Sequence, residues 1–185
     1  MTSAASMPEV IHWLAVQLAA FQAALLLASA LHKAMRLERA RTAVHELAGV
    51  PRHLASGAVA LVAGAEAATA LLLCMPAHRA AGGMLAAMIW ASYLVLILRA
   101  IAQGRSAVDC GCSFGAAPRP LGSYQVLRNA ALTCMGVSVA TFAAATAGDT
   151  APGPQTLLAA FALLSLYAAL DEVMSLRPLR TGVSA

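Results

Sequence analysis

Long apolar stretches separated by short polar segments dominate the pattern of this 185-residue chain. A helix needs about 20 apolar residues to cross a bilayer. The pattern predicts five such helices, at about residues 11–31, 54–75, 81–101, 125–147 and 155–176. Pro76, Gly104 and Pro152-Gly153-Pro154 mark ends of these segments, as expected of residues that break helices. The predicted fold is an all-α integral membrane protein with a single domain over residues 1–185, a bundle of four transmembrane helices plus a peripheral fifth.

Composition supports this fold class. The chain is 61% hydrophobic and only 11% charged, and its mean hydropathy is +0.76, whereas soluble domains carry about 25% charged residues. So little polar surface excludes a water-soluble globule, and the lipid bilayer is the first predicted partner. The net charge of +4 does not indicate nucleic-acid binding, because the basic residues fall near the ends of apolar segments. The first apolar segment is too long for a signal-peptide core and no basic region precedes it, so we expect it to be retained.

The distribution of basic residues predicts an orientation. With five spans, every Lys and Arg except Arg79 falls on the side that holds the first long loop, residues 33–53, and the second long loop, residues 102–124. Cytoplasmic loops of membrane proteins carry the excess of Lys and Arg. This rule places the second loop on the cytoplasmic side.

The second loop carries the most informative motif, Asp109-Cys110-Gly111-Cys112-Ser113-Phe114-Gly115. A disulfide between cysteines one residue apart closes a very small ring, which requires backbone distortion that the central glycine tolerates. Strained disulfides are readily reduced, which suits exchange better than permanent bracing. We therefore interpret Cys110 and Cys112 as a redox-active pair. A static staple, or two free thiols, is the alternative.

Neighbouring residues add candidates for this chemistry. Arg105 is placed to stabilise a thiolate, and Asp109 would oppose that effect or accept a proton during exchange. A zinc or copper site formed by the two loop cysteines with His32, His45 or His53 is a further alternative. No Cys-x-x-Cys or His-x-x-x-His pair supports it, so we expect no metal. The two other cysteines, Cys74 and Cys134, are expected to be small buried hydrophobic residues, with a redox relay as their alternative role.

Charged residues inside the predicted spans need partners. Glu66 lies midway along the second span, and Lys33 and Arg128 are the candidate partners. A proton relay and a structural ion pair that fixes helix packing are both open. His32 and Lys33 close the first span, either as functional groups or as interfacial side chains. Arg128 and Asn129 are candidates for hydrogen bonds to carbonyls of the cysteine loop, or for an interface anchor.

These residues together carry a family resemblance. In chain order they are His32-Lys33, Glu66, Gly104-Arg105, Asp109-Cys110-Gly111-Cys112, Phe114-Gly115 and Arg128-Asn129. The set resembles the methylamine utilisation protein MauE family, within the DoxX-like group of redox-associated membrane proteins, over about residues 27–132. The family pattern more often has Phe directly after the second cysteine, whereas Ser113 intervenes here. That departure bears on the loop geometry and leaves the cysteine pair intact.

The resemblance implies a role in protein maturation. MauE-like proteins are associated with the assembly of methylamine dehydrogenase-type enzymes that carry a tryptophan tryptophylquinone cofactor. The small subunit of these enzymes is periplasmic and rich in disulfides, and a thioredoxin-like protein, MauD, is thought to act with MauE on them. The resemblance thus implies a multi-pass protein of the bacterial inner membrane, whose Cys110 and Cys112 exchange disulfides with a MauD-type partner.

Other functions remain open on the sequence. The periplasmic client conflicts with the cytoplasmic placement of the loop, unless the protein carries reducing equivalents across the membrane. A quinone in the bundle is a candidate electron carrier, by analogy with membrane disulfide-generating enzymes, although no quinone motif is visible. A non-enzymatic docking factor is a second interpretation. A small-solute or metal transporter is a third, for which few polar residues within the spans provide a path.

Overall fold

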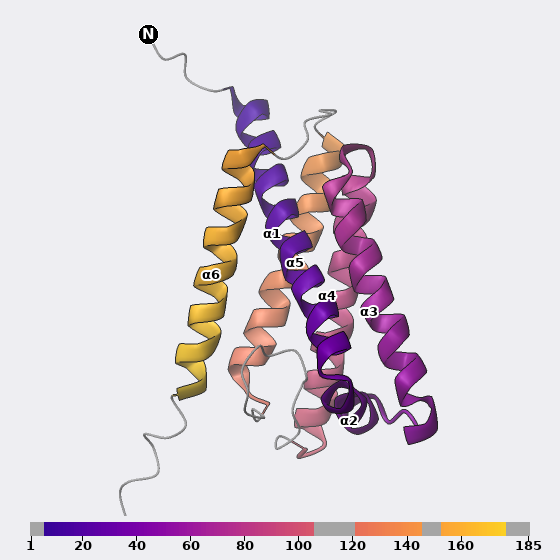
Figure 1. The fold of residues 1–185 in the computed structure, drawn as a ribbon. Coiled ribbons are helices and arrows are strands. Elements are labelled where there is room, and N and C mark those ends of the chain that lie inside the picture. The colour runs from indigo at the N-terminus through magenta and orange to yellow at the C-terminus, as the bar shows by residue number, and fades with distance from the viewer. Residues whose placement is uncertain (1–5, 106–120, 146–152, 177–185) are drawn as a thin grey trace, which may run out of the picture.

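A computed structural model describes residues 6–105, 121–145 and 153–176. Within these ranges the chain is helical and contains no strand (Figure 1). The elements in order are α1 (Met7–Met35), α2 (Leu37–Ala48), α3 (Arg52–Cys74), the 3-10 turn η1 (Pro76–His78), α4 (Arg79–Ala102), α5 (Ser123–Ala145) and α6 (Pro154–Leu176). The cysteine motif, residues 109–115, lies outside the described residues.

Five of the described helices are long and apolar enough to cross a membrane, which confirms the predicted fold class. These candidate spans are Glu9–Met35, Arg52–Cys74, Pro76–Ala102, Ser123–Ala145 and Pro154–Met174. The first span begins earlier than the predicted residue 11, because α1 starts at Met7 with Pro8 in its first turn. The chain is therefore a multi-pass membrane protein.

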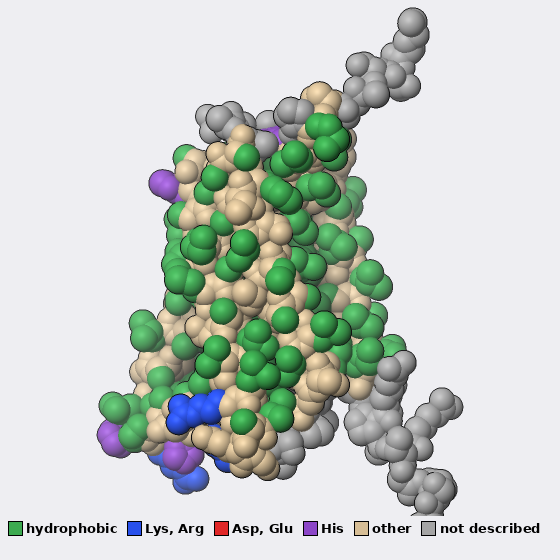
Figure 2. Space-filling model, turned by 180° about the vertical axis from the view of Figure 1, so that it is seen from behind, with side chains coloured by type: hydrophobic (Ala, Val, Ile, Leu, Met, Phe, Trp, Pro, Cys, Tyr) green, Lys and Arg blue, Asp and Glu red, His purple; other side chains and the backbone are tan. Residues whose placement is uncertain are grey.

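Four helices, α1, α3, α4 and α5, surround a common core, and α6 packs mainly along the outside of α1 (Figure 1). The core contains Phe21, Leu26, Leu73, Trp90 and Val139. In the apolar stretch of α1, 56% of residues are buried, against 11% in α6, so α1 is central and α6 peripheral. Apolar side chains also cover the outer surface (Figure 2). In a bilayer this surface faces lipid.

Small residues let α4 and α5 approach closely. A Cβ added to Gly83 would lie 2.6 Å from the backbone nitrogen of Ala140, and one added to Gly136 would lie 2.7 Å from that of Ala87. Gly83 and Ala87 are four residues apart on α4, as Gly136 and Ala140 are on α5. This is the small-xxx-small arrangement by which membrane helices pack backbone against backbone.

Helix α2 corrects the interpretation of residues 33–53 as a basic loop. The segment contains the end of α1 and then α2, which lies across the end of the bundle (Figure 1). Ala40, Ala43 and Leu47 are its buried residues and recur at helical spacing, whereas the polar residues Glu38, Thr42 and Glu46 are exposed. Gly49 ends the helix in a left-handed conformation, with φ of 70°. The helix was missed because it is too short and too polar to register as a span.

The α4–α5 contact yields a stability prediction. Gly136→Val should lower the free energy of unfolding by about 1–3 kcal/mol, because the added carbons would collide with the backbone of Ala87. Gly64→Val is the matched control, since Gly64 is also within a span but has no atom within 4 Å of an added Cβ. Unfolding of both purified variants in detergent would be compared with that of the parent chain. Equal losses in the two variants would contradict close packing at Gly136.

Candidate functional site

The described residues that flank the cysteine motif are both tied to neighbouring helices. On the N-terminal side, Gly104 adopts φ of 69° and turns the chain out of α4. Arg105 follows, and its guanidinium donates hydrogen bonds to the side chain of Gln103 and to the backbone carbonyl of Glu46 in the last turn of α2. Arg105 therefore joins the end of α4 to the end of α2. Its proposed effect on a thiolate stays a prediction, because the loop cysteines lie outside the described residues.

On the C-terminal side, Leu121 is buried in a small apolar cluster with Leu47 of α2 and with Ile97 and Ala100 of α4. The next residue, Gly122, donates its backbone N–H to the side chain of Gln125 at 2.9 Å, which caps the start of α5. Both flanks of residues 106–120 thus contact α2 and α4 at one end of the bundle. Asp109, Cys110, Gly111, Cys112, Phe114 and Gly115, all predicted site residues, lie within that segment and outside the described ranges.

A buried ion pair lies between α1 and α3 near the same end. Lys33 Nζ is 2.8 Å from Oε1 and 3.0 Å from Oε2 of Glu66. Glu66 is 0% exposed and Lys33 is 7% exposed. Of the two candidate partners for Glu66, Lys33 is the one that the structure places beside it. The two opposite charges neutralise each other, because an unpaired charge is strongly destabilising in apolar surroundings.

Two further side chains complete the surroundings of Glu66. Tyr93 of α4 donates its hydroxyl to Glu66 Oε1 at 2.6 Å, and Ser29 of α1 donates to the same oxygen at 3.0 Å. Lys33 Nζ also donates to Ser29 Oγ at 2.7 Å and lies 5.3 Å from the centre of the Tyr93 ring. Sequence reasoning missed Ser29 and Tyr93. Ser29 was detectable as the polar residue one turn before Lys33 on the same helix face.

A second polar link crosses the core closer to the middle of the bundle. Gln22 of α1 accepts a hydrogen bond from Trp90 Nε1 at 2.7 Å and donates one to the backbone carbonyl of Leu132 at 2.9 Å. Gln22 is fully buried, and both the oxygen and the nitrogen of its amide are hydrogen-bonded. Gln22 therefore joins α1 to α4 and α5. Such satisfied amides hold membrane helices together without providing a polar path.

Arg128 pairs with a residue other than Glu66. Its Nη1 lies 3.1 Å from Oδ1 of Asp171 in α6, and both side chains are buried. This ion pair attaches the peripheral helix to α5. Asn129, also buried, donates to the backbone carbonyl of Gln125 at 2.8 Å. The suggested hydrogen bonds from Arg128 and Asn129 to the cysteine loop fall outside the described residues and stay a prediction.

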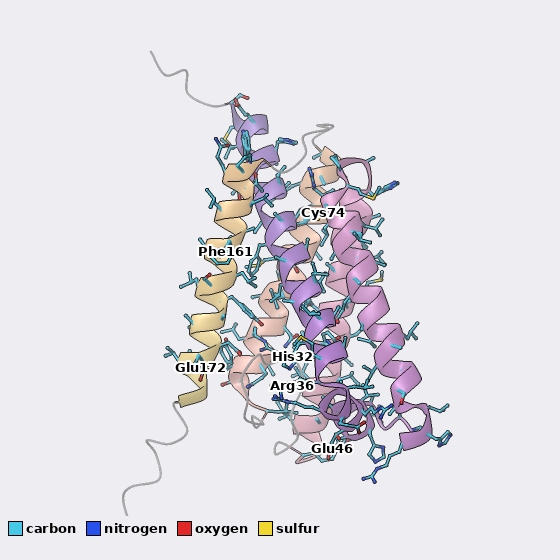
Figure 3. All side chains as sticks on the ribbon, viewed as in Figure 1. His32, Arg36, Glu46, Cys74, Phe161 and Glu172 are labelled. Atoms are coloured by element: carbon cyan, nitrogen blue, oxygen red, sulfur yellow. The ribbon has the colours of Figure 1, made fainter. Side chains whose placement is uncertain are left out.

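Three further candidates from the sequence are His32, Cys74 and Cys134. His32 is half-buried and lies with Arg36 and Glu46 at the α2 end, whereas Cys74 lies near the opposite end (Figure 3). Cys74 and Cys134 are exposed free thiols, which corrects the expectation that they are buried. Hydropathy alone cannot distinguish a core-facing cysteine from a lipid-facing one. In the described ranges, no group of three or more His, Cys, Asp or Glu side chains could hold a metal ion.

An apolar cavity of about 180 Å³ lies under α2, between that helix, α3 and α4. Val44 and Leu47 of α2, Val59 of α3, and Lys33 and Tyr93 are among its lining residues. The two polar side chains direct hydrogen bonds at Glu66. These walls match a hydrocarbon chain better than a quinone ring, which needs hydrogen-bond donors of its own. The quinone stays a prediction without a fitted site.

Comparison with known proteins identifies the family. The family model described as "Methylamine utilisation protein MauE" matches residues 11–145 of this chain. The chain belongs to the MauE family. It is 33% identical over 154 residues to the methylamine utilization protein MauE of Paracoccus denitrificans, with 80% of each chain covered. No solved structure matches.

The match places the MauE family features within one part of the fold. Residues 11–145 include most of α1, all of α2 to α5 and the cysteine segment. They include Lys33, Glu66 and Arg128, and they end before α6 and Asp171. The four-helix core with its buried ion pair therefore coincides with the MauE match, and the peripheral helix lies beyond it.

The buried pair of this MauE-family protein yields a second prediction. Glu66→Gln and Lys33→Met should each lower the free energy of unfolding by about 3–5 kcal/mol, because each leaves a buried charge without its partner. The double variant should lose less than the two single losses combined. Unfolding in detergent measures all three.

Glu38→Gln is the control for loss of a carboxylate. Glu38 pairs with Arg41 on the surface, and its side chain is 83% exposed. The expected loss is about 0.5 kcal/mol or less. Losses at Glu66 and Lys33 that simply add in the double variant would show that the pair is not energetically coupled.

Proposed function

We propose that this MauE-family protein is a thiol–disulfide exchange protein of the bacterial cytoplasmic membrane. In this proposal Cys110 and Cys112 exchange disulfides with a thioredoxin-like partner of the MauD type. The client is the small subunit of a periplasmic amine dehydrogenase that carries tryptophan tryptophylquinone. Family membership, which places the protein in methylamine utilisation, and the Cys-Gly-Cys motif support the proposal together.

The structural observation that carries the proposal is the anchoring of both flanks of the cysteine segment. Arg105 is held by Glu46 of α2, and Leu121 is packed against Leu47 and Ile97. A thiol that must meet a second protein needs a presentation point at the membrane surface. The ends of α2 and α4 provide a rigid one, since both helices pack on the core.

The proposed exchange proceeds in two balanced steps. One loop thiolate attacks a disulfide of the partner, forms a mixed disulfide and expels a partner thiolate. The second loop thiol, once deprotonated, attacks the mixed disulfide at the loop sulfur, closes the Cys110–Cys112 disulfide and releases the second partner thiol. The loop pair is oxidised by two electrons and the partner disulfide is reduced by two. The reverse direction delivers a disulfide to the partner, and the difference between the two reduction potentials sets the direction.

The buried network around Glu66 supports this function by holding the helices next to the cysteine segment in place. Glu66 accepts hydrogen bonds from Lys33, Ser29 and Tyr93. These bonds hold α1, α3 and α4 in register. We assign Lys33 and Glu66 a positioning role, because they fix the end of α1 from which α2 follows directly. Helix α2 in turn receives Arg105, next to the exchange segment.

The exchange proposal predicts that replacing both loop cysteines with serine abolishes maturation of the amine dehydrogenase. A single replacement of the resolving cysteine should trap a mixed disulfide with the thioredoxin-like partner, visible on a non-reducing gel. The double variant Cys74→Ser/Cys134→Ser is the matched control, because both residues are exposed on the outer surface of the bundle. Cells with this variant should produce mature amine dehydrogenase at the normal level. Normal maturation by Cys110→Ser/Cys112→Ser would contradict exchange and favour a docking role.

Sidedness provides an independent measurement. Direct exchange with a periplasmic partner predicts that a membrane-impermeant thiol reagent labels Cys110 and Cys112 from outside, only after mild reduction. A background of Cys74→Ser/Cys134→Ser removes the other two thiols. Labelling only after the membrane is opened would contradict direct exchange and agree with the basic residues at this end, which favour the cytoplasm. Transfer of reducing equivalents across the membrane would then be the leading interpretation.

A further inference from the structure

A polar cavity lies between the outer face of α2 and the first turns of α3. Its volume is about 450 Å³. Arg41 and His45 of α2 line it, together with Arg52 and His53 of α3. Among the residues that the structure describes, Glu38 is the one carboxylate in the lining. Four basic side chains from two helices thus converge on one hollow.

The charges in this cavity are only partly compensated. Glu38 pairs with Arg41, whereas Arg52 has no ion-pair partner within the described part of the chain. The Nε atom of Arg41 is buried and lacks a hydrogen-bond partner there as well. His45 is oriented by a hydrogen bond between its Nδ1 and the carbonyl oxygen of Val50 at 2.8 Å. Two guanidinium groups against one carboxylate leave a net positive charge before either histidine is protonated.

The cavity lies at the level of a membrane surface. The candidate span of α3 begins at Arg52, which is also a cavity residue. Helix α2 crosses this end of the bundle with its apolar residues inward, and Lys and Arg side chains gather at the same end (Figure 2). An amphipathic helix in that position lies in the headgroup region of a bilayer. The lipid phosphates therefore lie beside the cavity.

We propose that this cavity binds the phosphate headgroup of an anionic phospholipid. Arg41 and Arg52 donate hydrogen bonds to the phosphate oxygens, since guanidinium groups match phosphate geometry. The acyl chains then run along the outer face of α3, where Leu54 and Leu61 are 55% and 75% exposed. These two residues are seven apart and lie on one face of the helix. A continuous apolar surface below a basic cavity favours a lipid over a soluble anion.

The test uses the purified full-length protein in detergent, titrated with fluorescent phosphatidylglycerol and, separately, with phosphatidylcholine. Phosphatidylglycerol should bind more tightly. Arg41→Gln and Arg52→Gln should each weaken its binding about fivefold, and Arg99→Gln should change it by less than about twofold. Arg99 is the matched control, because it is exposed at the same end of the bundle, on α4, but does not line the cavity.

Three results would overturn the proposal. Equal weakening by all three variants would show general attraction to a basic surface. Displacement of the lipid by excess inorganic phosphate would show a site for soluble anions. Equal binding of the two lipids would show that the headgroup is not recognised. Arg52→Lys, which retains the charge, should bind better than Arg52→Gln, and unchanged melting temperatures would show that the variants are folded.

Discussion

The rest of the structure depends on the need to neutralise Glu66 inside an apolar bundle. A carboxylate without exposed surface requires a counter-charge and hydrogen-bond donors. Lys33 provides the charge from α1, and Tyr93 provides a donor from α4. These contacts fix the rotation and height of three helices relative to one another. Helix α2 follows α1 after a single residue, so its place across the end of the bundle is set by the same contacts.

A second face of α4 is held by a different kind of contact. Gly83 and Gly136 bring the backbones of α4 and α5 together, and dispersion contacts rather than charges stabilise that contact. Helix α4 therefore takes part in both kinds of contact. Tyr93 hydrogen-bonds Glu66 from one face, and Gly83 packs against α5 from another. The cysteine segment begins after the end of this doubly held helix. The N-terminal flank of the segment therefore follows a helix that is held on two of its faces.

Sequence reasoning reached the spans and the need of Glu66 for a partner, because long apolar runs and isolated charges are strong signals in a membrane protein. It left Lys33 and Arg128 as equal candidates, since sequence separation does not reveal which helices adjoin. Tyr93 carries no charge and gave no signal in an apolar run. Two features differ from the sequence-based expectation: residues 37–48 form helix α2 rather than a loop, and Cys74 and Cys134 are exposed rather than buried. Helix α2 is too short and too polar to register as a span, and a hydropathy window does not distinguish the core-facing side of a helix from the lipid-facing side.

The anchoring of Arg105 sets a limit on the reach of the chain that follows it. Cys110 is five residues further along, and an extended chain spans at most about 3.6 Å per residue, or about 18 Å in all. Helix α3, with 23 residues, is about 35 Å long, and Cys74 lies at its far end. The reach of the chain from Arg105 to Cys110 is therefore about half the length of α3. In the proposed exchange, the reach of the cysteine pair is therefore limited to the end of the bundle at which Arg105 is held.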